Sequence, residues 1–216
     1  MTQVSSGFLT QLARDRLLVI IRGADPEAAV AASLALLSSG IRFLEVSLVT
    51  ADALAVIAEV AHLAPDGAVI GAGTVLTRAD VARAAGAGAR FMVTPALTES
   101  VPESVAGGIP VLAGVLTPTE ALTAIGLGAD AVKLFPATLG GPSYLRALRE
   151  PLPDLPFIPV GGVDVALAGE YLASGAVAVG VGSALVGDAT RGGDLGALRA
   201  RAAAFLAVAA RSGRPV

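Results

Sequence analysis

The sequence predicts an α/β protein with a parallel sheet, and three features of its hydrophobic pattern lead to this fold class. Short, nearly continuous apolar runs alternate along the chain with Ala-rich amphipathic stretches of about ten to fifteen residues. The runs are continuous rather than alternating, as expected for parallel strands that helices cover on both faces. Eight runs in 216 residues give a repeat of roughly 22 to 25 residues, which fits a compact (β/α)8 TIM barrel.

The elements of this barrel follow one another at a regular spacing. An extra N-terminal helix over residues 3–15 precedes the first strand, and a last helix over residues 194–211 follows the eighth. The expected strands span residues 17–21, 43–48, 68–72, 91–93, 111–116, 131–135, 157–160 and 176–181. A doubly wound open sheet is the alternative that this pattern leaves open. No stretch has the composition of a linker, so residues 1–216 are expected to form a single domain with a loose tail over residues 211–216.

Capping sequences mark the starts of several helices between the strands. Asp25 and Thr117 each precede a proline at the expected first helical position. Thr77, with Asp80 three residues later, and Asp164 give the same signal for two further helices. Each of these starts comes shortly after an apolar run, which supports the strand–loop–helix order of a barrel.

The composition excludes several classes of chemistry. The chain has no Cys, which removes disulfides, thiolate nucleophiles and Cys-ligated metal centres. Its single histidine, His62, is expected on the surface of a helix over residues 51–63, which disfavours His-based metal sites and Ser–His–Asp triads. The net charge of −3 is spread along the chain and offers no basic stripe for nucleic acid.

The mean hydropathy of +0.74 raises the question of a membrane protein. The longest stretch free of charged residues and histidine, residues 171–187, has only 17 residues and contains four Gly. A membrane-spanning helix needs about 18 or more apolar residues, and the first 16 residues lack the apolar segment of a signal peptide. The sequence therefore predicts a soluble, cytoplasmic protein that does not enter a membrane.

Polar residues at the carboxyl ends of the expected strands are the candidates for function, because chemistry in a TIM barrel takes place there. These candidates are Arg22, Glu45, Thr74, Thr94 and Lys133, together with the turns Gly161-Gly162 and Gly182-Ser183.

Lys133 is the strongest candidate for a nucleophile. It lies within the apolar run over residues 131–135, where the alternation of side chains directs it toward the barrel centre. Removal from water lowers the pKa of a lysine, and a neutral amine can form a Schiff base with a carbonyl. The alternative is a lysine whose head group reaches water or pairs with an acid. The chain has fourteen Arg and one Lys, which favours the nucleophile, because Arg cannot deprotonate.

Glu45 is expected to share the barrel interior with Lys133. In the run Phe43-Leu-Glu-Val-Ser47, the side chains of Phe43, Glu45 and Ser47 point inward. A buried carboxylate needs a partner, so Glu45 either forms an ion pair with Lys133 or acts as a general acid/base beside a carbinolamine. Both roles can hold in the resting enzyme.

Glycine-rich turns complete the candidate site. Gly71-Ala-Gly-Thr74 ends the third strand with a hydroxyl that can bind a carboxylate or a carbonyl, although the same sequence also serves as a tight turn. The turns Gly161-Gly162 and Gly182-Ser183 follow the seventh and eighth strands, where barrels often bind phosphate, and tight turns are again the alternative. Arg22 either binds an anion or caps the barrel rim.

These residues together resemble a known family. The matching runs are Leu44-Glu-Val-Ser-Leu48, Gly71-Ala-Gly-Thr-Val-Leu76, Val93-Thr-Pro95, Ala131-Val-Lys-Leu-Phe-Pro-Ala137, Gly140-Gly141, Gly161-Gly162 and Gly180-Val-Gly-Ser183. In this order and at these separations they resemble the 2-keto-3-deoxy-6-phosphogluconate (KDPG) aldolases. That family also includes the 4-hydroxy-2-oxoglutarate (KHG) and 2-dehydro-3-deoxy-6-phosphogalactonate aldolases. The resemblance covers residues 17–185.

The resemblance implies a metal-independent class I aldolase without a cofactor, usually a homotrimer, that acts on a phosphorylated keto acid. It implies that Lys133 is the Schiff-base lysine and that Glu45 is the general acid/base. The other residues that it implicates in the site are Thr74 for the pyruvate carboxylate, Pro95 and Phe135 for the pocket walls, and Gly161, Gly162 and Ser183 for the phosphate. Gly182 is a further substrate-binding candidate because of its place in the turn after the eighth strand. The expected reaction is cleavage of 2-dehydro-3-deoxy-6-phosphogluconate to pyruvate and glyceraldehyde 3-phosphate.

Two departures from the phosphogluconate pattern leave the sugar open. Val49 replaces an arginine that binds the carboxylate, and Val160 replaces a threonine before the paired glycines. Both features resemble the phosphogalactonate type, whereas Leu139-Gly140-Gly141 resembles the phosphogluconate type. A phosphogalactonate or 4-hydroxy-2-oxoglutarate aldolase, a non-catalytic barrel that binds a phosphorylated metabolite, and a non-covalent phosphate-barrel isomerase or synthase are the alternatives. Arg22 is a candidate to replace the missing carboxylate ligand.

Overall fold

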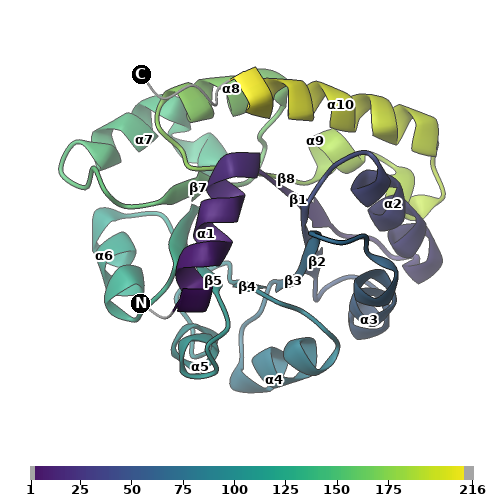
Figure 1. The fold of residues 1–216 in the computed structure, drawn as a ribbon. Helices are drawn as coiled ribbons and strands as arrows, with labels where there is room; N and C mark the ends of the chain where they lie inside the picture. The colour runs from purple at the N-terminus through teal and green to yellow at the C-terminus, as the bar shows by residue number, and fades with distance from the viewer. Residues whose placement is uncertain (1–2, 212–216) are drawn as a thin grey trace.

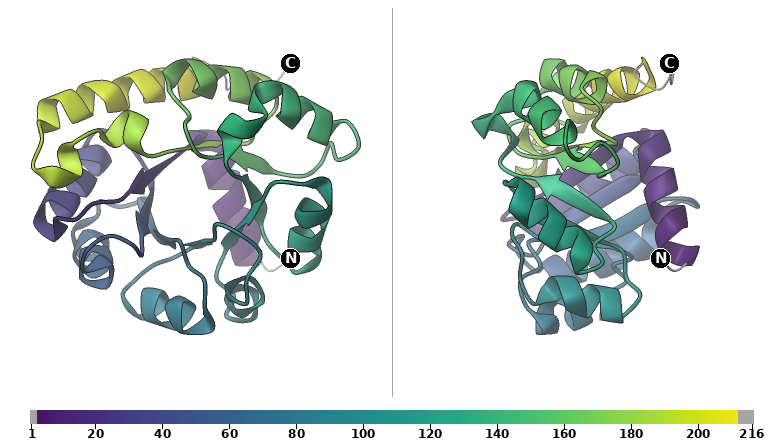
Figure 2. Two further views of the ribbon diagram at one scale, coloured as in Figure 1. Left: turned by 180° about the vertical axis from the view of Figure 1, so that it is seen from behind. Right: turned by 90° about the vertical axis from the view of Figure 1, so that its left-hand side faces the viewer.

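Eight parallel strands form the barrel that the sequence predicts. The computed structural model describes the backbone of residues 3–211 and the side chains of residues 7–211. The strand order is β7-β6-β5-β4-β3-β2-β1-β8, and a bridge between Val160 and Gly180 joins the two ends of this sheet. Helices surround the ring of strands (Figures 1 and 2). The (β/α)8 TIM barrel is therefore confirmed, and the open doubly wound sheet is excluded.

The strands lie close to the predicted apolar runs. They are β1 Leu17–Ile21, β2 Phe43–Ser47, β3 Val69–Gly73, β4 Met92–Val93, β5 Val111–Val115, β6 Ala131–Leu134, β7 Phe157–Pro159 and β8 Val179–Val181. The main difference concerns the last strand, which begins three residues later than predicted. The amide of Ala176 still donates to the carbonyl of Tyr171 at the end of α8, whereas the amide of Val177 already donates to Phe157 of β7.

The helices begin where the capping sequences predict. They are α1 Gln3–Asp15, α2 Pro26–Ser38, α3 Ala53–Leu63, α4 Arg78–Gly86, α5 Ser100–Ala106, α6 Pro118–Gly126, α7 Gly141–Arg149, α8 Val165–Ala173, α9 Ser183–Val186 and α10 Leu195–Arg211, with 3-10 turns η1 Ala137–Leu139 and η2 Ala189–Arg191. Thr77 and Thr117 form complete capping boxes with Asp80 and Glu120. The predicted N-terminal helix has the expected bounds. Residues 212–216 of the predicted tail lie outside the described residues.

Helix α1 closes the amino-terminal end of the barrel. It lies in front of the ring of strands in Figure 1 and at one side of the molecule in the right-hand view of Figure 2. Phe8 and Leu12 are buried from this helix in a cluster with Phe43 and Phe91. The rings of Phe8 and Phe43 meet edge to face, with centroids 5.6 Å apart. This end of the interior is therefore filled with apolar side chains.

Side chains of each strand alternate between two cores. Leu44 and Val46 of β2 belong to the larger core between strands and helices, whereas Phe43 belongs to the core inside the barrel. Glu45 and Ser47 follow Phe43 on the inward face and are buried. In β6, Val132 and Leu134 likewise pack toward the helices. The predicted inward orientation of Glu45 and Lys133 is confirmed.

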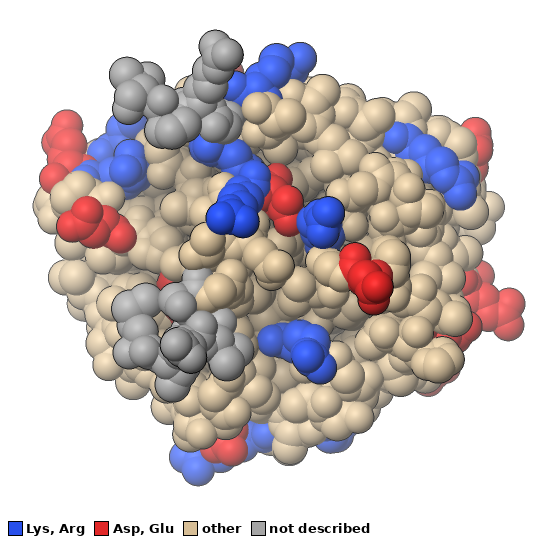
Figure 3. Space-filling model, viewed as in Figure 1, with Lys and Arg blue, Asp and Glu red and all other residues tan. Residues whose placement is uncertain are grey.

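Charged side chains of both signs lie on the face of the molecule that carries α1. On the face that α1 covers, Figure 3 shows both signs interspersed among uncharged residues, in agreement with the small net charge of −3. Among residues 3–211, no helix combines the length and the apolarity that a membrane span requires. His62 is exposed on α3, as predicted.

Candidate active site

Glu45 and Lys133 lie inside the barrel, toward the carboxyl ends of the strands. Only 1% of Glu45 and 6% of Lys133 is exposed to solvent. Glu45 pairs in register with Gly71 of β3, and Lys133 pairs with Gly114 of β5. The polar groups therefore have glycines as their partners in register. The ring of Phe91 packs against Gly71, and the backbone of Pro95 packs against Gly114.

Two of the neighbouring positions accept no side chain. A Cβ atom on Gly73 would overlap the Oε1 atom of Glu45. A Cβ atom on Gly114 would overlap the backbone of Pro95 and lie 2.6 Å from the amide nitrogen of Ala96. Gly114 thus lets the loop after β4 approach the strand that neighbours Lys133. Sequence reasoning did not identify Gly114; its signal was a glycine within an otherwise apolar strand.

The carboxyl group of Glu45 is held in an environment that favours its protonated form. Burial raises its pKa, and the charges of Lys133 and Arg22 oppose this rise only in part. Its Oε2 atom has no hydrogen-bond partner among the described residues. An ion pair between Glu45 and Lys133 was one alternative. Among residues 7–211, the cations that form ion pairs are Arg78 and Arg83, so this pair is not formed. The charge of Lys133 nevertheless acts on Glu45, because it lowers the pKa of the carboxyl group against the effect of burial.

Phe135 lies between Lys133 and the turn that follows β7. The Nζ atom of Lys133 is 5.2 Å from the centroid of the Phe135 ring, a distance typical of a cation–π contact. A Cβ atom on Gly161 would lie 3.2 Å from the same ring. The ring is 38% exposed, so it forms part of the site's open wall.

Thr74 follows β3 in an unusual backbone conformation. Its φ of 58° lies in the left-handed region, which a β-branched residue rarely adopts. Its Oγ1 atom is 2.8 Å from the Oγ atom of Ser47, the last residue of β2. The pattern of β2 predicted that Ser47 points inward, but nothing in the sequence indicated this contact.

Thr94 fixes the loop that carries Pro95. The Thr94 hydroxyl donates to the carbonyl of Ala96 at 2.7 Å and accepts from the amide of Gly114 at 3.0 Å. Thr94 is fully buried, so this pair of bonds is shielded from water. The loop after β4 is thereby held against β5, next to Lys133.

The turns after β7 and β8 lie side by side because Val160 bridges to Gly180. Gly161 and Gly162 both have positive φ, 101° and 71°, which only glycine adopts without strain. Ser183 is exposed at the first position of α9, directly after Gly182. The predicted glycine turns are thus neighbours.

Three further positions lie around this end of the barrel. Arg22 is exposed after β1, and its carbonyl accepts a hydrogen bond from Thr190 at 2.9 Å. Val49 is 61% exposed beyond the end of β2, whereas Val160 is buried within the interior cluster.

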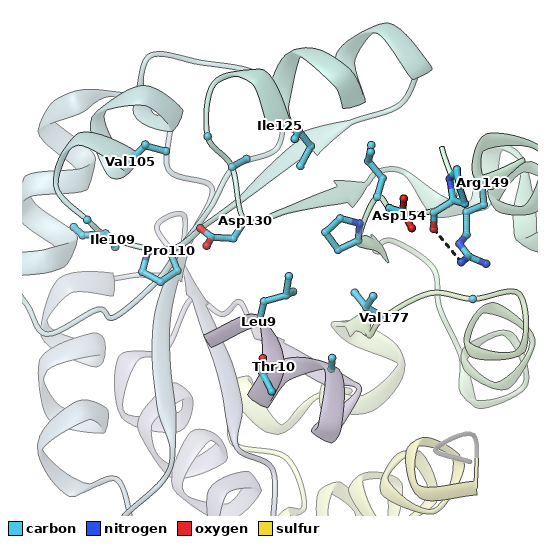
Figure 4. Close-up of a pocket in the computed structure, with 18 residues that line it drawn as sticks. Leu9, Thr10, Val105, Ile109, Pro110, Ile125, Asp130, Arg149, Asp154 and Val177 are labelled. Carbon is cyan, nitrogen blue, oxygen red and sulfur yellow. Dashed lines mark hydrogen bonds between the residues drawn. The ribbon is translucent and has the colours of Figure 1, made fainter. Parts of the chain in front are cut away.

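A cavity of about 800 Å³ lies at the opposite end of the barrel. It is lined by α1 and by the loops that lead into β5, β6 and β7, and Figure 4 shows Leu9, Pro110 and Asp130 around it. Because Lys133 is the only lysine of the chain, amine chemistry has no nucleophilic side chain there. The arrangement at the carboxyl ends of the strands is therefore the candidate active site. Among the described residues, no three His, Asp or Glu side chains gather where they could hold a metal ion.

A barrel that buries its one lysine near a carboxylic acid, at the carboxyl ends of the strands, defines a class of enzymes that work on carbonyl compounds through an amine. Comparison with known proteins agrees with this class. The family model described as "KDPG and KHG aldolase" matches residues 9–200. The chain belongs to this aldolase family and is a lyase.

Relatives and solved structures support the assignment. The chain is 42% identical over 193 residues to the probable 2-dehydro-3-deoxy-6-phosphogalactonate aldolase of Rhizobium meliloti (strain 1021), which covers 88% of this chain and 90% of that protein. It is 38% identical to the KHG/KDPG aldolase of Escherichia coli (strain K12), over 78% of this chain and 80% of that protein. A KDPG aldolase from Legionella pneumophila, solved with pyruvate as a covalent carbinolamine, has a TM-score of 0.84 and 30% identity, over 94% and 98% of the two chains.

Proposed function

We propose that the protein is a class I, Schiff-base aldolase that cleaves 2-dehydro-3-deoxy-6-phosphogluconate to pyruvate and glyceraldehyde 3-phosphate. The observation that carries this proposal is the burial of the only lysine, Lys133, inside the barrel near Glu45. The carbinolamine of pyruvate in the Legionella pneumophila relative supports the same chemistry. The 42% identity to a probable phosphogalactonate aldolase makes the phosphogalactonate epimer the second candidate substrate.

In this mechanism the amine of Lys133 attacks the C2 carbonyl of the substrate. The carbinolamine loses water to form an iminium ion, and Glu45 gives and takes the protons of these steps. The C3–C4 bond then breaks: its electron pair forms the C2=C3 double bond of an enamine while the C=N π pair moves to the nitrogen, the C4 hydroxyl loses its proton, and the aldehyde leaves. The resulting enamine takes a proton at C3, and hydrolysis releases pyruvate and the free amine. The raised pKa of Glu45, caused by its burial, suits a group that must hold a proton and then release it.

The remaining candidate residues bind the substrate in this proposal. Thr74 binds the pyruvate carboxylate, and Arg22, whose charge acts on Glu45, adds a cation at the site mouth. Pro95 and Phe135 form the walls. The residues proposed for the phosphate are Gly161, Gly162, Gly182 and Ser183, and the pairing of Val160 with Gly180 supports their common role.

We also propose that the active form is a cytoplasmic homotrimer. The resemblance to the family supports this state. One similar structure, a designed protein cage made by fusing symmetric oligomeric domains, has a TM-score of 0.84 and 32% identity over 91% of this chain and 73% of that chain. Light scattering of the purified protein tests the oligomeric state.

Trapping with borohydride tests the Schiff base directly. The protein is incubated with pyruvate and borohydride, and peptide mass mapping locates the adduct. We expect a pyruvyl adduct on Lys133 and none in Lys133→Arg; the N-terminal amine is the only other primary amine of the chain. A wild-type protein without an adduct on Lys133 contradicts the proposal.

Turnover assays separate the remaining alternatives. The phosphogluconate and phosphogalactonate epimers are compared side by side, with 4-hydroxy-2-oxoglutarate as a third substrate. A non-catalytic metabolite-binding barrel would be stabilised against heat by sugar phosphates without releasing pyruvate. An isomerase or synthase would keep its activity in Lys133→Arg, whereas an aldolase would lose it.

A further inference from the structure

Ser47 is a buried hydroxyl in the candidate site to which no role has been given. It is fully buried at the end of β2, two residues after Glu45 and on the same inward face. Among the described residues, its side chain has one hydrogen bond, to Thr74 Oγ1 at 2.8 Å. A buried hydroxyl with a single side-chain partner couples closely to that partner.

Thr74 needs a contact that fixes its hydroxyl. Its left-handed backbone sets it outside the preferred conformations of a β-branched residue. The neighbouring backbone is held on both sides, since Leu48 donates to Gly73 at 2.8 Å and Val75 donates to Val93 at 3.2 Å. These bonds fix the main chain of the turn, whereas the hydrogen bond between the Ser47 and Thr74 hydroxyls fixes the side chain. Thr74 is only half-buried, so part of this residue is accessible from the carboxyl end of β3.

When an anion is bound, the protons that the two hydroxyls can donate determine the direction of the hydrogen bond between Ser47 and Thr74. Each hydroxyl has one proton to donate and can accept at its lone pairs. A substrate carboxylate only accepts, so Thr74 must give its proton to the carboxylate. Ser47 then donates to Thr74, and the two bonds strengthen each other. Val49, two residues after Ser47, offers no side-chain donor for the same carboxylate.

We propose that Ser47 is a positioning residue, whose hydroxyl orients Thr74 Oγ1 so that Thr74 donates to the carboxylate of the keto acid. This inference rests on the proposed function, because it requires a keto acid bound at Lys133. Ser47 acts through Thr74 and does not itself touch the substrate. A merely structural role, in which Ser47 only satisfies a buried turn, predicts changes in stability without changes in keto-acid binding.

The test measures how the rate of borohydride trapping at Lys133 depends on pyruvate concentration. In Ser47→Ala we expect the half-saturating pyruvate concentration to rise about five- to tenfold, the effect of one lost hydrogen bond. The trapping rate at saturating pyruvate should stay within about twofold, because the amine and Glu45 are untouched. Ser47→Thr keeps the hydroxyl and should show the wild-type half-saturating pyruvate concentration. Ser47→Cys is a second variant of similar size, whose thiol is only a weak hydrogen-bond donor.

A double-mutant cycle shows whether Ser47 acts through Thr74. Thr74→Val removes the hydroxyl and keeps the shape. In this background Ser47→Ala should change the half-saturating concentration by less than about twofold. The role of Ser47 is overturned if the effects of the two substitutions on the half-saturating pyruvate concentration multiply in the double mutant. It is also overturned if this concentration is unchanged in both Ser47→Ala and Ser47→Cys. In either case, an adduct in the wild-type protein still upholds the proposed function. A wild-type protein without an adduct overturns both.

Discussion

The amino-terminal half of the barrel interior holds Phe8 and Leu12 from α1 against Phe43 and Phe91, whereas the carboxyl half holds Glu45 and Lys133 among glycines. Both halves are built by the same strands: in β2, the step from Phe43 to Glu45 is two residues along one inward face. In β2 and β6, the inward-facing positions near the amino ends thus hold apolar side chains, whereas those near the carboxyl ends hold the polar groups of the site.

The largest effect on stability is expected at the amino-terminal half. Phe8→Ala removes a buried ring that contacts the rings of Phe43 and Phe91, so we expect a loss of about 3–5 kcal/mol in the free energy of unfolding. Urea unfolding measures this loss, with Phe8→Leu as the milder control. Below its melting temperature, the variant should turn over substrate at a rate within about twofold of wild type. A strong loss of turnover in the folded variant would contradict the separation of the two halves.

Replacing Glu45 tests the opposite half. Glu45→Gln removes the proposed proton carrier, so kcat should fall by about 10²- to 10⁴-fold, as measured by pyruvate release. If the variant turns over at the wild-type rate, Glu45 is not the general acid/base.

The same variant gives a pH dependence of stability with a definite sign. Burial raises the pKa of Glu45 in the folded state, so as pH rises the unfolded chain ionises first and stability falls until the pH exceeds the folded value. Gln cannot ionise. Glu45→Gln should therefore gain stability relative to wild type as pH rises through this window, and the difference should vanish below the unfolded pKa. Thermal melts of both proteins across this range measure it; a difference that grows toward acid pH would reverse the sign.

A smaller effect is expected from closing the space beside Glu45. Gly73→Ala would place a methyl group on the Oε1 atom of Glu45 and displace the carboxyl, so we expect turnover to fall by about 10- to 100-fold. Gly126→Ala is the matched control, because a Cβ atom there meets nothing within 4 Å. Equal activity in the two variants would show that the position of the carboxyl is unimportant.

The smallest effect is expected at Thr117, which follows β5 at the carboxyl end of the barrel. It tests whether a residue has a role in function merely because it lies at this end. Thr117→Ala breaks the capping box of α6, a loss of about 1 kcal/mol in unfolding free energy. Thr117 is exposed, and its side chain bonds to Glu120 of its own helix. Turnover should stay unchanged at a temperature where the variant is folded. A drop in kcat without a drop in stability would extend the functional region to this cap.

The sequence predicted the parts of the structure that depend on local periodicity. The twofold alternation of β2 and β6 was sufficient to point Glu45 and Lys133 inward, and the capping pairs were sufficient to start helices at Thr77 and Thr117. The contact of Ser47 with Thr74 was not predictable, because it depends on a left-handed backbone at Thr74. A β-branched residue such as threonine favours other backbone conformations. The approach of Pro95 to Gly114 depends on the tertiary pairing of β4 with β5, which local periodicity does not describe.

The seam between β1 and β8 also has a consequence for how the chain folds. Leu17 pairs with Val179, so β1 finds one of its two neighbours only after almost the whole barrel has been synthesised. Until then β1 has an unpaired edge, and Phe8 can reach Phe91 only after the fourth repeat is made. The pairing of β1 thus depends on the end of the barrel sequence. Closure of the barrel brings together segments far apart in the chain, a contact of high contact order that forms late in folding.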